Sequence, residues 1–315
     1  MADKIATRQA YGDTLVELGR DNPDIVVLDA DLSKSTMTAG FAKAYPDRFF
    51  NAGIAEQDLM GMAAGLSTMG KIPFASTFAV FAAGRAFEQV RNTICYPKLN
   101  VKIAATHAGI TVGEDGGSHQ SVEDIALMRV LPNMTIIAPA DAVEASQAVR
   151  AAAAHRGPVY IRLSRLATPV IFDARHEFEI GKAVVVREGK DISLFSTGTM
   201  LAAALAAADR LADEGLRAEV VNVATIKPLD AGTILASLAK TGCGVTCEEH
   251  SIIGGLGSAI AEIVVENDPL PLTRVGLLDV FGESGKPDEL LQRYGLTGDD
   301  IVIAARRAFL RKTHQ

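Results

Sequence analysis

Residues 101–120 read VKIAATHAGITVGEDGGSHQ, a short apolar run followed by a loop that contains four glycines. The run predicts a buried strand, because a strand covered on both faces reads as a continuous apolar segment. Further runs of this kind alternate with alanine-rich helical patterns, which indicates parallel βαβ units. The other predicted strands lie at 24–31, 71–76, 134–140 and 158–164, and the predicted helices at 56–69, 84–95 and 141–155.

A second alternating block begins near residue 183. The segment between the blocks, LATPVIFDARHEFEIG at 166–181, has no periodicity and contains a proline and mixed charges. We therefore expect an α/β fold with two doubly wound domains, at 1–170 and 183–315, the second on a smaller five-stranded sheet with helices on both faces. The strands of the second block are predicted at 191–199, 218–230, 243–250 and 272–279, and its helices at 199–213, 230–240, 256–267 and 298–312.

The composition narrows the classes of function. The 315 residues carry a net charge of −7 and 5% aromatic residues without tryptophan, which argues against a general nucleic-acid binder. No uncharged apolar run is long enough to span a membrane. The N-terminal stretch MADKIATRQA has no apolar signal-peptide core, so we expect a cytoplasmic protein. The three cysteines, Cys95, Cys243 and Cys247, are too scattered for a disulfide framework and are expected to be reduced.

The glycine loop places two histidines, His107 and His119, around the acidic pair Glu114-Asp115. A metal site is one interpretation, but this histidine spacing matches no common ligand pattern. A loop that brings imidazole and carboxylate to a polar substrate is the second, and a surface Ω-loop without a site is the third. Because the loop follows a strand, its side chains are expected at the strand's carboxyl end, where α/β proteins bind ligands.

A glutamate and two aromatic residues follow neighbouring strands. Glu56 begins an apolar predicted helix, where a carboxylate interacts favourably with the helix N-terminus. Capping does not account for Phe78 and Phe81, which could form an aromatic wall for a flat heterocycle, although core filling explains the two rings equally well.

Two motifs of the second block are interpreted as structural. The stretch GLGSA at 255–259 weakly matches a dinucleotide fingerprint and is read as ordinary strand-to-helix packing. The preceding Glu248-Glu249-His250 is read as a solvated sheet edge, with a role at a subunit contact as the alternative.

Several segments, in a fixed order over nearly the whole chain, carry a resemblance to a known family. Together they resemble the C-terminal section of transketolase. The resemblance implies a first, mainly parallel domain that binds the pyrimidine of thiamine diphosphate, and a second, smaller transketolase C-terminal domain with a mixed sheet. The matching segments are ATRQAYGDTL, LDADLSKST, NAGIAEQDLM, STFAVF, THAGITVGEDGGSHQSVED, PADAVEA and RLSR.

The resemblance assigns cofactor-binding roles to four residues. Glu56 falls on the family's invariant glutamate, which hydrogen-bonds N1′ of the aminopyrimidine and favours the imino form, whose N4′ takes the proton from C2 of the thiazolium. Phe78 and Phe81 fall on positions that pack against the pyrimidine, and Asp31 on one near the thiamine.

The resemblance also implies a substrate channel. His107, Asp115 and His119 match positions that bind sugar hydroxyls, and the two histidines, with Glu56, are the expected catalytic residues. Three further residues match positions that hold the phosphate of a sugar phosphate: Arg8, Ser35 and Arg165. The planar fork of arginine suits this task, because it can donate two hydrogen bonds to one phosphate.

The chain departs from the family pattern at two places. The third aromatic residue of the family is absent: Gly84 takes its place and Arg85 follows, so the packing of the pyrimidine ring is left open. Gln57 replaces the histidine that usually follows the glutamate, as in the related deoxyxylulose-phosphate synthases.

No Gly-Asp-Gly motif, which in the family holds Mg²⁺ and the diphosphate, occurs in the sequence. We therefore expect a naturally split enzyme, with an engineered fragment as the alternative. The N-terminal partner subunit would supply the diphosphate-binding domain and the Mg²⁺ ligands, this chain would supply none, and the assembly would be an α2β2 heterotetramer. The expected reaction, in pentose phosphate or related carbohydrate metabolism, transfers a two-carbon glycolaldehyde unit from a ketose phosphate to an aldose acceptor.

Three rival functions remain. The β subunit of a 2-oxoacid dehydrogenase has the same two domains, but the segment from His107 to His119 argues against it. Half of a deoxyxylulose-phosphate-synthase-like enzyme would share IAEQ at 54–57 and DGGSH at 115–119, but that family has an acidic-basic pair where this chain has Thr106-His107. The third is a non-catalytic assembly subunit that kept the fold and lost the reaction.

Overall fold

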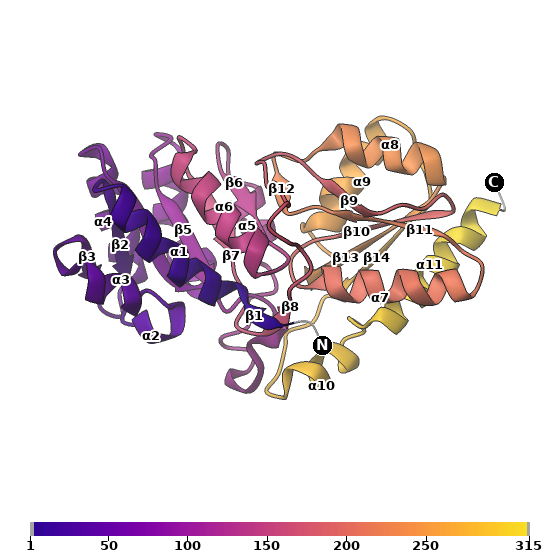
Figure 1. The fold of residues 1–315 in the computed structure, drawn as a ribbon, viewed down its shortest axis with the longest axis horizontal. Coiled ribbons are helices and arrows are strands. Elements are labelled where there is room, and N and C mark those ends of the chain that lie inside the picture. The colour runs from indigo at the N-terminus through magenta and orange to yellow at the C-terminus, as the bar shows by residue number, and fades with distance from the viewer. Residues whose placement is uncertain (1–2, 314–315) are drawn as a thin grey trace.

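The computed structural model describes residues 3–313, which form two α/β units side by side (Figure 1). The first unit is built on a seven-stranded sheet with the order β12-β6-β7-β5-β4-β2-β3, parallel except for β12. Its strands are β2 (Ile25–Asp29), β3 (Phe49–Asn51), β4 (Ile72–Phe78), β5 (Lys102–Thr106), β6 (Thr135–Ile137), β7 (Val159–Arg162) and, from later in the chain, β12 (Thr225–Lys227). The short strands β1 (Lys4–Ala6) and β8 (Ala167–Pro169) pair separately.

The central strands of this sheet are covered on both faces. All residues of β2 and β5 are buried, as their continuous apolar sequences predict. The α-helices that accompany the sheet are α1 (Thr7–Asp21), α2 (Ser33–Thr36), α3 (Ala39–Ala44), α4 (Glu56–Thr68), α5 (Asp124–Arg129) and α6 (Ala142–Ala154). Two 3₁₀ segments, η1 (Pro46–Arg48) and η4 (Ile110–Asp115), complete the connections.

The predicted helix at 84–95 is not a regular α-helix. Residues 81–95 instead contain two π-helical segments, η2 (Phe81–Arg85) and η3 (Gln89–Cys95), joined by three residues. Their wide turns are visible in the backbone bond from the N–H of Ala86 to the oxygen of Phe81, five residues earlier. π-Turns are rare and concentrate at functional sites, and η2 carries both Phe81 and Arg85 of the predicted cofactor region.

The second unit has a five-stranded mixed sheet with the order β14-β13-β10-β11-β9, in which β9 is antiparallel. This confirms the expected smaller mixed sheet. Its strands are β9 (Val184–Arg187), β10 (Ile192–Ser196), β11 (Ala218–Asn222), β13 (Gly244–Ser251) and β14 (Leu272–Leu277). Its helices are α7 (Met200–Asp213), α8 (Ala231–Thr241), α9 (Leu256–Glu266), α10 (Pro287–Arg293) and α11 (Gly298–Thr313). Helices α7 and α11 share one hydrophobic core, and α8 and α9 share another.

The two units interlock at their junction. The run predicted as one strand at 218–230 splits into β11 and β12 (Thr225–Lys227), and β12 pairs with β6 of the first sheet. A buried ion pair between Arg162 and Asp124 lies beside this junction, and Arg162 also donates to the backbone oxygen of Glu249 at 2.9 Å. The second unit is therefore anchored to the first by both backbone and side-chain contacts.

The prediction of a solvated sheet edge at 248–250 is wrong. Glu248, Glu249 and His250 are 0%, 3% and 0% exposed, because β13 ends against the first unit. The Glu248 carboxylate accepts the backbone N–H groups of Leu256 and Gly257 at the start of α9. A side chain of the protein thus occupies the helix N-terminus that the dinucleotide fingerprint would reserve for a phosphate.

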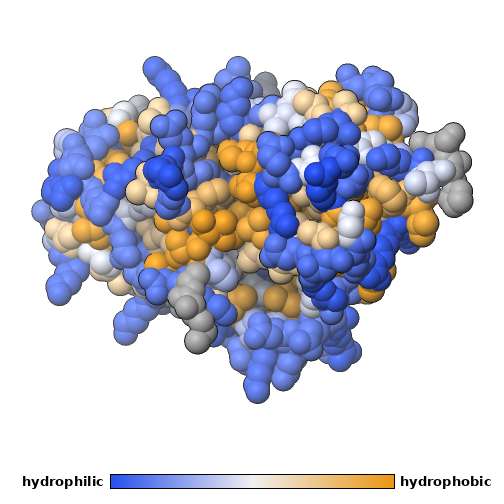
Figure 2. All heavy atoms as spheres, turned by 45° about the vertical axis from the view of Figure 1, so that its right-hand side comes forward, coloured by the Kyte–Doolittle hydropathy of each residue, from blue (hydrophilic) through white to orange (hydrophobic). Residues whose placement is uncertain are grey.

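Hydrophobic and hydrophilic residues are unevenly distributed over the surface. Figure 2 shows hydrophobic residues gathered near the middle of one face, with hydrophilic residues dominant towards both ends. Within residues 3–313, no helix combines the length and the apolar composition that a membrane span requires. Cys95, Cys243 and Cys247 are buried free thiols, as expected from the sequence.

Candidate active site at the carboxyl ends of the first sheet

Residues from four parallel strands meet at one edge of the first sheet. Asp31 follows β2, Glu56 follows β3 and begins α4, Phe78 ends β4, and His107 follows β5. The carboxyl ends of adjacent parallel strands lie at the same edge, so the βαβ order in the sequence brings these side chains together. The edge is therefore the candidate active site.

Glu56 is a buried carboxylate at a helix start, with a side chain that is 1% exposed. Its Oε2 accepts a hydrogen bond of 2.8 Å from Nη1 of Arg85, which is itself half exposed. The Gln57 side chain reaches back to the backbone oxygen of Arg85 at 3.3 Å. The positive end of the α4 dipole and the guanidinium both stabilise negative charge on Glu56.

Flat rings form a wall beside Glu56. The rings of Phe78 and Phe81 are nearly parallel, with centroids 6.0 Å apart. His107 stacks on Phe78 at 3.8 Å, and His119 meets the edges of both phenylalanines at 6.2 and 5.5 Å. The guanidinium of Arg85 lies over Phe81, 4.7 Å from its centroid. The structure thus groups the carboxylate, the two phenylalanines and both histidines in one place.

His107 has a defined tautomer and an unusual backbone. Its Nε2 lies 3.1 Å from Nη1 of Arg8, and because arginine can only donate, Nε2 is the acceptor. The proton therefore sits on Nδ1 and is shared with Oγ1 of Thr106 at 2.9 Å. Burial, with the positive charges of Arg8, Arg165 and His119, lowers the pKa of His107 to about 3. The backbone φ of 58° is left-handed, a strained conformation that is often found at functional sites.

The predicted phosphate-binding residues make two separate sets of hydrogen bonds, one around Arg8 and one around Arg165. Arg8 donates to the backbone oxygen of Ser35 at 2.8 Å, so it joins α2 to the end of β5. Arg165 donates to the oxygen of Val112 at 2.6 Å and to Asp115 at 3.2 Å. Burial, and then the charge of Arg165, lower the pKa of Arg8.

Two predicted residues, Asp31 and Asp115, are hydrogen-bonded to residues outside the ring wall. Asp31 pairs with Asn51 through hydrogen bonds of 3.0 Å in both directions. Among residues 3–313, the hydrogen bonds of Asp115 and His119 do not join them to each other: His119 Nδ1 instead lies 3.0 Å from Oγ of Ser118. The roles assigned to these side chains stay predictions.

The loop that carries His119 is held from the second unit, which sequence reasoning missed. The carboxylate of Glu249 accepts the backbone N–H of Thr111 at 2.7 Å and the hydroxyl of Thr199 at 2.9 Å. Further along the loop, Gln120 donates from Nε2 to the backbone oxygen of Glu283 at 2.8 Å. The available signal was the acidic pair Glu248-Glu249 inside a strand pattern. Carboxylates that are buried in a strand are usually paired or hydrogen-bonded, so such a pair indicates polar partners elsewhere in the fold.

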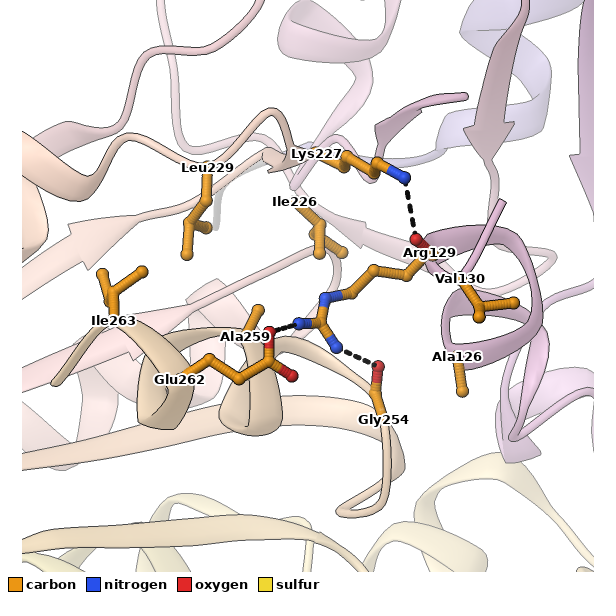
Figure 3. A pocket seen from close by; sticks show the side chains of 10 residues that line it. All are labelled: Ala126, Arg129, Val130, Ile226, Lys227, Leu229, Gly254, Ala259, Glu262 and Ile263. Carbon is orange, nitrogen blue, oxygen red and sulfur yellow. Dashed lines mark hydrogen bonds and ion pairs between the residues drawn. The ribbon is translucent and has the colours of Figure 1, made fainter. Parts of the chain in front are cut away.

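An open groove lies elsewhere, at the junction of α5, β12 and α9. It has a volume of about 510 Å³, and its two cations are already engaged (Figure 3). Arg129 bonds to Glu262 and to the oxygen of Gly254, and Lys227 bonds to the oxygens of Arg129 and Leu131. No predicted site residue lines this groove, which is therefore a feature of the junction and separate from the candidate active site.

Comparison with known proteins places this architecture in a family. Residues 3–170 match the model of the transketolase pyrimidine binding domain, and residues 181–301 match the transketolase C-terminal domain. A Methanocaldococcus jannaschii protein with the provisional name transketolase C-terminal section is 54% identical over 94% of this chain and 93% of its own length. The SqwH subunit of a 6-deoxy-6-sulfo-D-fructose transketolase from a Clostridium species is 46% identical over 97% and 95%.

A solved structure is similar over the same extent. It is described as a split-gene transketolase in the form of an inactive β4 tetramer, and it aligns with a TM-score of 0.92 and 60% identity over 98% of this chain and 99% of its own. The chain therefore belongs to the transketolase family, of which it contains the pyrimidine-binding and C-terminal domains.

Proposed function

We propose that this chain is one subunit of a split, thiamine-diphosphate-dependent transketolase. Its residues 1–170 form the pyrimidine-binding domain and residues 183–315 the C-terminal domain, and a partner subunit supplies the diphosphate-binding domain with its Mg²⁺ ligands. The reaction transfers a two-carbon unit from a ketose phosphate to an aldose acceptor. The observation that carries the proposal is the convergence of Glu56, the phenylalanine wall and His107 at one sheet edge.

The residues at this edge fit an aminopyrimidine. A buried carboxylate can accept a ring N–H, and a flat heterocycle can lie against Phe78 and Phe81. Gly84 faces open space: a Cβ built there meets nothing within 4 Å, so room remains where an aromatic side chain of the family is replaced. The chemistry that bound thiamine diphosphate supplies is cleavage of the carbon–carbon bond beside a carbonyl and transfer of the two-carbon fragment.

The residues of this chain then have separate tasks. Glu56 holds the aminopyrimidine by a charged hydrogen bond and so sets the proton position on its ring. His107, in its neutral form, and His119 face the substrate, where imidazoles bind hydroxyl groups and move protons between oxygen atoms. The side chains of Phe78 and Phe81 exclude water from this region.

An anionic end group on the substrate suits the arginines. Arg8 and Arg165 act on the same histidine electrostatically, so both contribute positive potential at the channel. Phosphate and sulfonate both present several oxygens to a guanidinium fork. The sulfosugar relative makes a sulfonated ketose the second candidate donor for this chain.

Reconstitution tests the proposal. The purified chain is assayed with thiamine diphosphate, Mg²⁺, a ketose phosphate and an aldose, with and without the diphosphate-binding subunit. We expect turnover only in the mixture, in line with the description of the split-gene relative as inactive in its β4 form. Full activity of the isolated chain would contradict the split-subunit proposal.

A variant of the central carboxylate separates catalysis from assembly. Glu56→Ala in the reconstituted complex is expected to abolish most turnover, because the charged hydrogen bond to the cofactor is lost. Size-exclusion chromatography of the same complex controls for assembly. Unchanged turnover with an intact complex would favour a non-catalytic assembly subunit.

A further inference from the structure

Arg85 makes two contacts at the candidate cofactor site that are of unlike kinds. Its Nη1 donates to the buried carboxylate of Glu56 at 2.8 Å. Its guanidinium carbon lies over the ring of Phe81, 4.7 Å from the centroid. A planar cation thus donates an N–H to the glutamate and covers an aromatic face with the same group.

These are the contacts that the proposed function requires of an aminopyrimidine. That ring would also donate an N–H to the Glu56 carboxylate and lay its flat face against the phenylalanine wall. A carboxylate can accept more than one N–H, but a flat heterocycle cannot lie on the face of Phe81 that the guanidinium already covers. We propose that Arg85 is an internal placeholder, which fills the pyrimidine position in the free chain and is displaced when the cofactor binds.

The surroundings of Arg85 allow such a movement. Its side chain is 50% exposed, so the guanidinium can rotate into water without crossing the core. Gly84 beside it meets nothing within 4 Å of a built Cβ, which leaves open space next to the pyrimidine position. Glu56, in contrast, is 1% exposed and fixed at the start of α4.

A physical reason for the placeholder follows from burial. A carboxylate that is almost fully removed from water is costly unless it is paired. In the free chain Arg85 provides the pairing, and in the loaded enzyme the aminopyrimidine takes it over. The inference rests on the proposed function for the identity of the ligand, whereas the pairing of Glu56 with Arg85 is a property of the chain itself.

The first measurement tests the pairing without any cofactor. Glu56→Gln, Arg85→Met and the double variant are compared in urea unfolding of the isolated chain. We expect non-additive effects, since either single variant breaks the pair. Additive effects would show that the two side chains are not coupled, and the placeholder would be excluded.

The second measurement uses thiamine diphosphate itself as the probe. Calorimetry gives its dissociation constant for the reconstituted complex in excess Mg²⁺, with wild-type chain and with Arg85→Met. Because the variant has no guanidinium to displace, we expect affinity to rise about tenfold. Arg91→Met, at an exposed position on η3, is the matched control and should leave the affinity unchanged.

The outcomes separate the inference from the proposed function. If the wild-type complex binds thiamine diphosphate and Arg85→Met binds it equally or more weakly, Arg85 helps to hold the cofactor or has no part in binding, and the placeholder is wrong. If the wild-type complex does not bind thiamine diphosphate, the proposed function fails, and the assignment of Arg85 fails with it.

Discussion

The carboxylate of Glu249, at the end of β13, accepts the backbone N–H of Thr111 at 2.7 Å, so a residue of the second α/β unit fixes the loop that carries His119. The same carboxylate also accepts the hydroxyl of Thr199. Because η4 begins at Ile110, this bond holds the start of the loop between the two histidines. The C-terminal domain thus takes part in shaping the candidate active site, although none of the predicted site residues belongs to it.

Glu249→Ala should weaken the loop and lower activity together. The N–H of Thr111 would remain buried without a partner, which costs about 1–3 kcal/mol in unfolding free energy. Glu249→Gln keeps an oxygen for Thr111 and an amide that can donate to Thr199, so its effect should be smaller. Urea unfolding and the KM for the donor sugar of the reconstituted enzyme measure both effects. Equal losses for the two variants would show that this hydrogen bond is not the cause.

Gly109→Ala should be destabilising for two independent reasons. Its φ of +81° is strained for alanine, and a built Cβ lies 2.1 Å from Oε1 of Glu249. We expect a loss of about 2 kcal/mol or more, since the Glu249 side chain would have to leave its position. Gly65→Ala, inside α4 and without neighbours within 4 Å, is the control and should stabilise by about 0.5–1 kcal/mol. Thermal unfolding of the isolated chain compares the two.

Lys102→Met should destabilise the first unit. The Nζ of this buried lysine donates to Oδ1 of Asn100 and to the backbone oxygens of His155 and Gly157, at 2.6 to 2.8 Å. Methionine preserves the volume but leaves two carbonyls without this donor, at a cost of about 2 kcal/mol or more. Lys98→Met, at an exposed neighbouring position, should change little. A loss below about 0.5 kcal/mol in urea unfolding would contradict the prediction.

Local pattern was enough to predict the central strands of both sheets, but it did not predict helix α1 or the edge strands β3 and β9. The failures at the junction of the two units share a physical cause. The runs at 24–31 and 101–106 are strands because both faces are buried, which a continuous apolar sequence records. The departure of β12 to the first sheet, and the burial of Glu248 and Glu249, depend on partners that lie far away in the sequence. The grouping of Glu56, Phe78 and His107 followed from strand order, but the pairing of Glu56 with Arg85 depends on the π-helical turn, which leaves no periodic signal.

The neutral state of His107 should be visible as a pH dependence of stability. Its pKa is about 3 in the fold and near 6.5 when unfolded. Below pH 6.5 the unfolded chain therefore binds a proton that the folded chain does not, and stability falls as the pH falls from about 6.5 towards 3. His107→Asn has no titrating side chain at this position. Between pH 6.5 and pH 5 its free energy of unfolding should therefore fall by about 2 kcal/mol less than that of the wild type. Urea unfolding at the two pH values measures the difference, and parallel losses in both proteins would contradict the assigned pKa.

The role of Arg8 in binding an anionic substrate can be separated from its structural role. Arg8→Met removes the contact with His107 as well as positive charge, so activity with every donor should fall to some extent. The informative quantity is the ratio of kcat/KM for a phosphorylated ketose to that for its unphosphorylated analogue. Loss of a charge-assisted hydrogen bond should lower this ratio about tenfold or more. Arg20→Met, at the exposed end of the same helix α1, should leave the ratio unchanged. If Arg8→Met lowers kcat/KM equally for the two donors, Arg8 only positions His107, and the anion must be bound elsewhere. The same ratio can be measured for a sulfonated ketose against the analogue that lacks the sulfonate. If Arg8→Met lowers that ratio more than the ratio for the phosphate, the sulfonate is favoured as the natural substrate.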